Sequence, residues 1–141
     1  MGGTGAGPAL NSKPGLARPL KVLVADDDAL NLRVAARLLR EQGCSGALVT
    51  SGDKALQLIA QREFDLMLLD ISMPQMDGAQ TLQALRERER QGVRHLPVIM
   101  VSGFNDPATV ERFLAAGADG FLVKPLAADS LRAEICRLTG G

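Results

Sequence analysis

The sequence predicts a doubly wound α/β domain, in which helices cover both faces of a parallel sheet. Two observations support this prediction. Short apolar runs alternate five times with helical patterns along the chain. These runs are apolar throughout, which is typical of strands that are buried on both faces. Right-handed crossovers between successive parallel strands then place the intervening helices on either side of the sheet.

Each strand and helix of this fold has its own signal in the sequence. The strands are expected at Lys21–Ala25, Gly46–Thr50, Phe64–Leu69, Val98–Val101 and Gly120–Val123. The five helices are expected around the stripes Leu30/Val34/Leu38 (widened by Ala35 and Leu39), Ala55/Leu56/Ile59, Ala79/Leu82/Leu85, Val110/Phe113/Leu114 and Leu131/Ile135/Leu138. Gly43 and Gly117 are stop signals after the first and fourth helices, and Pro107 suits the first turn of the fourth.

Length and composition predict one domain and exclude several classes of protein. Residues 1–19 are rich in Gly and Pro and show no hydrophobic period, so we interpret them as a flexible linker or tag remnant before a folded unit over residues 20–141. The net charge of zero and the absence of Trp and Tyr argue against direct nucleic-acid binding. No apolar run is long enough for membrane insertion. The two separated cysteines favour a reducing, cytoplasmic location.

Polar side chains are predicted to gather where the strands end. Asp26 and Asp27 follow the first strand, Asp70 the third, Ser102 the fourth and Lys124 the fifth. Ligands of open parallel sheets bind at this carboxyl edge. Crowded carboxylates need a cation, and an all-oxygen donor set suits Mg²⁺ better than zinc. A carboxylate nucleophile near a metal, a lysine and a hydroxyl is an arrangement suited to phosphoryl transfer.

Four segments that carry these residues resemble the receiver domain of two-component response regulators. They are KVLVADDDALN, LMLLDISMPQMDG, VIMVSG and AAGADGFLVKP, and they occur in the family's order. The resemblance covers nearly all of the predicted folded unit. It implies a (βα)5 flavodoxin-like three-layer sandwich with strand order 2-1-3-4-5.

The resemblance also implies a phosphoacceptor and a metal site. Asp70 would be the phosphoacceptor. Asp27 and Asp70 would bind Mg²⁺ directly, Asp26 would act through water, and the backbone carbonyl of Ser72 would complete the protein ligands. The domain would then act as a switch and not as an enzyme, with a histidine kinase or a histidine phosphotransfer protein as its phosphodonor.

The remaining residues of the four segments would bind the phosphoryl group and transmit its arrival. Ser102 and Lys124 would contact the phosphoryl group, and Pro125 would follow Lys124 through a cis peptide bond. Phe121 stands at the position of the family's switch aromatic. Phosphorylation would then reshape the face of the fourth helix, fifth strand and fifth helix, which could bind a partner or a second copy. We expect the parent protein to be a hybrid histidine kinase, slightly in preference to a single-domain or truncated regulator.

Two alternative functions remain open from the residues. A haloacid-dehalogenase-type phosphatase would use Asp26 as its nucleophile and Asp28 as its acid/base group, but Asp28 is better explained as a helix N-cap. Such an enzyme would also leave the DISMPQMDG segment unexplained. The second alternative is a receiver-like interaction module that is never phosphorylated.

Several other residues suggest ordinary structural roles. Asp77 and Gly78 suit a turn and a helix cap. The run Arg86–Arg90 suits a solvated helix end, and His95, the only histidine, suits an exposed loop position without a role. Phe104 either shields the phosphorylation site from water or is a simple exposed loop residue.

Overall fold

The chain folds as five successive strand–helix units. The computed structural model describes residues 19–73 and 75–140, so the predicted linker, apart from Pro19, lies outside the described residues. The strands are β2 (Lys21–Ala25), β3 (Ser45–Val49), β4 (Leu66–Asp70), β5 (Val98–Ser102) and β6 (Gly120–Val123). The helices are α2 (Ala29–Glu41), α3 (Gly52–Gln61), α4 (Gly78–Glu89), α5 (Pro107–Ala115) and α6 (Ala128–Thr139).

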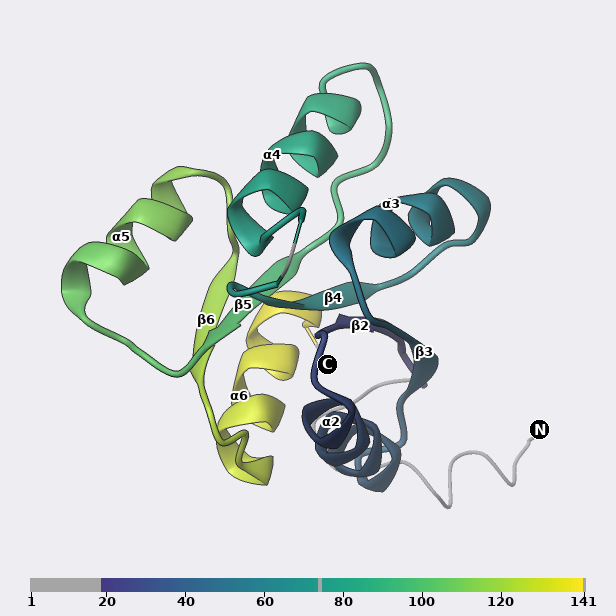
Figure 1. The fold of residues 1–141 in the computed structure, drawn as a ribbon. Helices are drawn as coiled ribbons and strands as arrows, with labels where there is room; N and C mark the ends of the chain where they lie inside the picture. The colour runs from purple at the N-terminus through teal and green to yellow at the C-terminus, as the bar shows by residue number, and fades with distance from the viewer. Residues whose placement is uncertain (1–18, 74, 141) are drawn as a thin grey trace.

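The described strands form one parallel sheet with the order β3-β2-β4-β5-β6 (Figure 1). Counted from the first strand, this is the predicted order 2-1-3-4-5. Helices α2 and α6 cover one face of the sheet, and α3, α4 and α5 cover the other (Figure 1). Successive side chains of a strand point to opposite faces, so Val22 and Val24 join the core under α2 and α6 while Leu23 and Ala25 join the other. The predicted three-layer sandwich is confirmed.

Local signals fix where the helices begin and end. The carboxylate of Asp28 accepts hydrogen bonds from the backbone at the start of α2, as expected for an N-cap. Asp106 caps α5, and Pro107 is its first residue. Gly43 and Gly117 have φ angles of 81° and 113°, which favour glycine after the first and fourth helices. These stop signals are therefore confirmed.

The predicted buried stripe of the first helix is partly wrong. Leu30 is 62% exposed, whereas Leu32, Ala35, Leu38 and Leu39 are buried. The α2 sequence contains two adjacent apolar stripes that both satisfy helical periodicity. Packing against β2 and α6 decides which stripe faces the core, and periodicity alone does not contain that information.

Strand ends also differ from the predicted ranges. Phe64 is buried but precedes β4, so the apolar run begins before the pairing does. Asp70 and Ser102 are the last residues of β4 and β5 and not the first residues after them, and Asp70 pairs in register with Val101. Apolar composition reports burial, while a strand's bounds depend on hydrogen bonds with its neighbours.

The charged run Arg86–Arg90 is not uniformly solvated, which corrects the sequence interpretation. The side chains of Arg86 and Glu89 are only 11% and 9% exposed and form an ion pair. His95 contacts both Glu89 and Asp119, so it does not lack partners.

Among the described residues, no helix combines the length and apolarity needed to span a membrane.

Candidate functional site

Three aspartates meet at the carboxyl edge of the sheet. Asp26 directly follows β2, and Asp70 ends the neighbouring β4, because Ala25 and Leu69 are partners in the register. One oxygen from each of Asp26, Asp27 and Asp70 lies within 4.8 Å of the other two. Asp26 and Asp70 are buried, with 5% and 4% exposure, whereas Asp27 is exposed. The parallel topology thus brings together carboxylates that lie more than 40 residues apart.

Lys124 completes this cluster from the end of β6. Its Nζ lies 3.0 Å from Oδ1 of Asp70 and 3.2 Å from Oδ2 of Asp26. Its backbone N–H donates to the carbonyl of Ser102 at 2.7 Å, which ties the ends of β5 and β6 together. The Lys124–Pro125 peptide bond is cis. The ammonium group therefore bridges two buried carboxylates.

The electrostatics of the cluster favour a further cation. Burial raises the pKa of Asp70 above its ordinary value, and the nearby charge of Asp26 adds to this, although the hydrogen bond from Lys124 opposes it. Burial acts to lower the pKa of Lys124, but its contacts with Asp70 and Asp26 outweigh burial and raise it. One ammonium thus faces three carboxylates, and the uncompensated negative charge attracts a cation with oxygen preference.

An open pocket lies beside the three aspartates. It is lined by Asp27, Ile71, Ser72, Met73 and Asp77. The backbone N–H of Ser72 also hydrogen-bonds the carboxyl group of Asp70. The pocket gives solvent and ligands a route to the exposed side of the carboxylate cluster.

The loop after β4 is closed by the start of α4. Asp77 forms a capping box with Gln80, as the turn-and-cap interpretation expected. An ideal Cβ on Gly78 would lie 2.6 Å from the carbonyl oxygen of Asp70 and 2.8 Å from Cα of Ile71. Only glycine allows this close approach without displacing the backbone that carries Asp70. The sequence did not reveal this constraint, because the contact partner lies eight residues away across a loop.

Ser102 is buried at the end of β5, next to β4 and β6. Its Oγ accepts a hydrogen bond from the backbone N–H of Phe104 at 3.0 Å. Phe104 is 76% exposed. That exposure favours the simple loop interpretation of Phe104 over the shielding one.

A more enclosed cavity lies on the other side of the cluster, beneath Asp26, Asp70 and Lys124. Asn31 and Leu126 contribute to its lining. Sequence reasoning assigned Asn31 no role, although it ends the KVLVADDDALN segment. The packing of α2 beside the Lys124 loop brings it to the site.

Phe121 lies on β6 and packs against Phe113 of α5, with ring centroids 6.5 Å apart. Its side chain is half-buried. Leu114 on α5 and Val123 on β6 are 44% and 37% exposed. The Phe121 side chain therefore links β6 to α5, and both of these elements contribute to a partly apolar surface.

The geometry does not support the phosphatase alternative. Asp28 caps α2 with hydrogen bonds from the backbone N–H groups of Leu30 and Asn31. It is not a member of the carboxylate cluster formed by Asp26, Asp27 and Asp70. The proposed acid/base group is thus engaged in a structural role.

Comparison with known proteins agrees with this arrangement. The family model of the response regulator receiver domain matches residues 22–136. The sensory/regulatory protein RpfC of Xanthomonas campestris pv. campestris is 34% identical over 81% of this chain and 16% of its own length. The sensor histidine kinase AruS of Pseudomonas aeruginosa is 40% identical over 80% of this chain and 11% of its own length. The chain thus spans only a small part of these relatives.

Solved structures show the same similarity. The receiver domain of the Francisella response regulator 1452 superposes with a TM-score of 0.78 and 30% identity, over 86% of this chain and 97% of that one. The signal receiver domain of a signal transduction histidine kinase from Syntrophus aciditrophicus gives a TM-score of 0.76 and 30% identity, over 86% and 91%. The chain therefore belongs to the receiver domains of two-component signalling.

Proposed function

We propose that this domain accepts a phosphoryl group on Asp70 from a phosphohistidine of a partner protein. The observation that carries the proposal is the position of Asp70: it is buried at the end of β4, 3.0 Å from the Lys124 ammonium and beside Asp26 and Asp27. A carboxylate held against a lysine and further carboxylates is suited to be an in-line nucleophile once a metal is bound.

The donor set fits Mg²⁺. Asp26, Asp27 and Asp70 offer carboxylate oxygens, and Ser72 lines the pocket beside them together with Asp27. These are hard oxygen ligands, and they leave room for the several waters that Mg²⁺ retains. When bound, the ion would neutralise charge on the carboxylates and on the phosphoryl oxygens.

In the transfer step, an oxygen of Asp70 forms a bond to phosphorus as the P–N bond of the phosphohistidine breaks. The electron pair of that bond stays on the ring nitrogen, and with the other ring nitrogen protonated the group leaves as neutral imidazole, so that an aspartyl phosphate remains. Lys124 is placed to pair with a phosphoryl oxygen, since its ammonium already contacts the Asp70 carboxylate. The Ser102 hydroxyl, on the adjacent strand, would donate a hydrogen bond to another phosphoryl oxygen.

The signal would then travel along β5 and β6 to the surface of α5, β6 and α6. Ser102 and Lys124 are joined through their backbones, and Phe121 lies three residues before Lys124 on β6. Repositioning of the Ser102 loop would change the packing of Phe121 against Phe113. The exposed apolar side chains Leu114 and Val123 suit a surface that binds a partner or a second copy of the chain.

The phosphodonor would be a histidine kinase or a histidine phosphotransfer protein. Sensor kinases are among the relatives of this chain, and the chain spans only a fraction of their length. A parent protein with a kinase domain would thus supply the phosphohistidine itself, and the phosphoryl group would pass to Asp70 either within that protein or between two protein molecules.

Intact-mass spectrometry tests the proposal directly. We expect a single phosphoryl adduct after incubation with acetyl phosphate and Mg²⁺, and none without the metal. The adduct should be labile in base, as an acyl phosphate is. Asp70→Asn should abolish it. Asp77→Asn is a matched control, because Asp77 lines the same pocket but caps α4, a role that asparagine also fills.

Beryllium fluoride separates a short-lived phosphate from an inert site. Binding of beryllium fluoride by the wild type and not by Asp70→Asn supports the proposal even where no phosphoryl adduct survives. If the wild type forms no adduct and binds no beryllium fluoride, the proposal is refuted and the interaction module that is never phosphorylated is favoured.

A further inference from the structure

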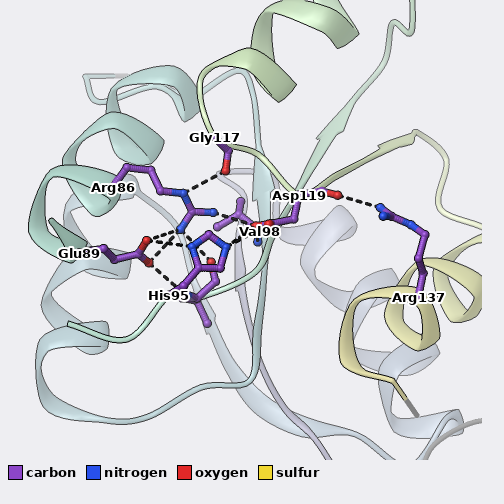
Figure 2. A network of polar contacts seen from close by, with 8 residues as sticks. Arg86, Glu89, His95, Val98, Gly117, Asp119 and Arg137 are labelled. Atoms are coloured by element: carbon purple, nitrogen blue, oxygen red, sulfur yellow. Dashed lines mark hydrogen bonds and ion pairs between the residues drawn. The ribbon is translucent and has the colours of Figure 1, made fainter. Parts of the chain in front are cut away.

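A second polar cluster lies at the opposite edge of the sheet, at the amino ends of β5 and β6 (Figure 2). Its centre is the guanidinium of Arg86 near the end of α4. This group donates to the carbonyls of Gly117 and Leu96 at 3.0 and 2.9 Å and pairs with Glu89 and Asp119 at 2.8 Å. Arg86 thereby joins α4, the loop before β5 and the turn before β6.

The imidazole of His95 closes this cluster on its solvent side. Its Nδ1 lies 3.1 Å from Oε1 of Glu89, and its Nε2 lies 3.0 Å from Oδ1 of Asp119. The His95 side chain is 54% exposed, whereas that of Glu89 is 9% exposed. Both ring nitrogens thus face carboxylates, one on α4 and one in the turn before β6 (Figure 2).

Ionised carboxylates only accept hydrogen bonds, and a neutral imidazole has one N–H. Both contacts are therefore hydrogen bonds only when both nitrogens carry a proton. With a neutral ring, one nitrogen lone pair faces a carboxylate. The charges of the cluster also favour the doubly protonated ring. The single positive charge of Arg86 faces the two negative charges of Glu89 and Asp119, and a protonated imidazole makes the sum of these four groups zero.

Further charged groups surround the cluster, and the neutral sum above counts only Arg86, Glu89, Asp119 and His95. On the side of α6, Arg137 pairs with Glu134 while donating to the carbonyl of Asp119 at 2.7 Å. A shallow pocket beside the ring also holds Arg62, Glu63 and Arg94.

We propose that His95 is a proton-sensitive latch that fastens the loop before β5 to the turn before β6 when its ring is doubly protonated, and loosens that connection when it is neutral. Loosening has an identifiable structural consequence. The two carboxylates that His95 bridges also accept the backbone N–H groups of Leu96 and Val98, at 2.8 Å each. Motion of Glu89 or Asp119 therefore weakens the hydrogen bonds that start β5.

Residue-specific amide hydrogen exchange of the full chain tests the latch. An ordinary histidine side chain changes its charge between about pH 5 and 8. We expect the protection factors of Leu96 and Val98, corrected for the intrinsic pH dependence, to fall about three-fold across that range, the scale of a half-exposed charge interaction. The amide of Val24 in the centre of the sheet provides the internal reference. His95→Gln is the matched variant, because its side chain forms hydrogen bonds but does not titrate.

The sole histidine gives a second readout, since its imidazole resonances follow its protonation without overlap. The latch requires that the midpoint of the exchange change coincides with the midpoint of the imidazole titration and that the change is absent in His95→Gln. Equal pH dependence of Leu96 and Val98 in the wild type and the variant would overturn it, as would midpoints that differ.

Discussion

Replacing Gly78 with alanine is expected to deform the segment that carries the phosphoacceptor. Gly78 is the first residue of α4, and its N–H donates to the carbonyl of Ile71 at 2.9 Å. The added methyl group would lie 2.6 Å from the carbonyl oxygen of Asp70 and 2.8 Å from Cα of Ile71. Both are backbone atoms, so no flexible side chain can move aside to make room.

The size of the effect follows from two opposing terms. Overpacking of this kind costs about 1–3 kcal/mol, because the backbone around the added group has to shift. Alanine has the higher helix propensity, which recovers at most about 1 kcal/mol at the first residue of α4. We therefore expect Gly78→Ala to lower the free energy of unfolding by about 1–2 kcal/mol.

Urea denaturation followed by far-ultraviolet circular dichroism measures this difference, since the chain has no Trp or Tyr for fluorescence. Gly103→Ala is the matched control. It lies at the same carboxyl edge of the sheet, directly after β5, but a Cβ there meets nothing within 4 Å. We expect its effect to stay within about 0.5 kcal/mol.

The displaced backbone should also affect chemistry at Asp70. Gly78→Ala should slow formation of the phosphoryl adduct more than Gly103→Ala does. If both variants have the same stability and the same phosphorylation rate, then the close approach of Gly78 does not constrain Asp70 and the reasoning fails.

Three further changes test the electrostatics of the two edges of the sheet. Burial raises the pKa of Asp70, so the folded state holds its proton more tightly than the unfolded state does. Asp70→Asn should therefore increase the free energy of unfolding at pH 7 by about 0.5–1 kcal/mol, and urea denaturation should show this gain disappear below about pH 4. Mg²⁺ at ten times its dissociation constant should stabilise the wild type by about 1.4 kcal/mol in thermal denaturation; Asp27→Asn should lose this gain and Asp77→Asn should keep it. Arg86→Gln should cost about 2–4 kcal/mol in urea denaturation, because it removes the guanidinium charge that pairs with the carboxylates of Glu89 and Asp119. Arg90→Gln, at the exposed C-cap of the same helix, should cost less than about 0.5 kcal/mol.

The strand–helix order, the parallel sheet and its three layers could all be predicted from the sequence. Each strand run is apolar on both faces, and each helix is marked by capping residues or a terminal glycine, such as Asp28 and Gly43. These signals are local, and they agree with one another. The buried stripe of α2 could not be predicted, because Leu30 and Leu32 begin equally good periodic patterns and only packing distinguishes them.

The meeting of the candidate site residues also followed from topology. Once the strands are parallel and ordered, their carboxyl ends share one edge, and the structure places Asp26, Asp70 and Lys124 within contact distance there. The role of Gly78 did not follow, because a close backbone approach depends on the path of a loop.

The sequence by itself determined the class of fold, the family and the residues offered at one edge of the sheet, because these depend on short-range patterns and on motif order. Only the tertiary structure decided how charges pair. Arg86, Glu89 and His95 read as surface residues along the chain, yet they converge with Asp119, which lies 24 residues beyond His95. Whether a charged side chain is solvated or buried depends on which distant segment packs against it, and no local pattern records that.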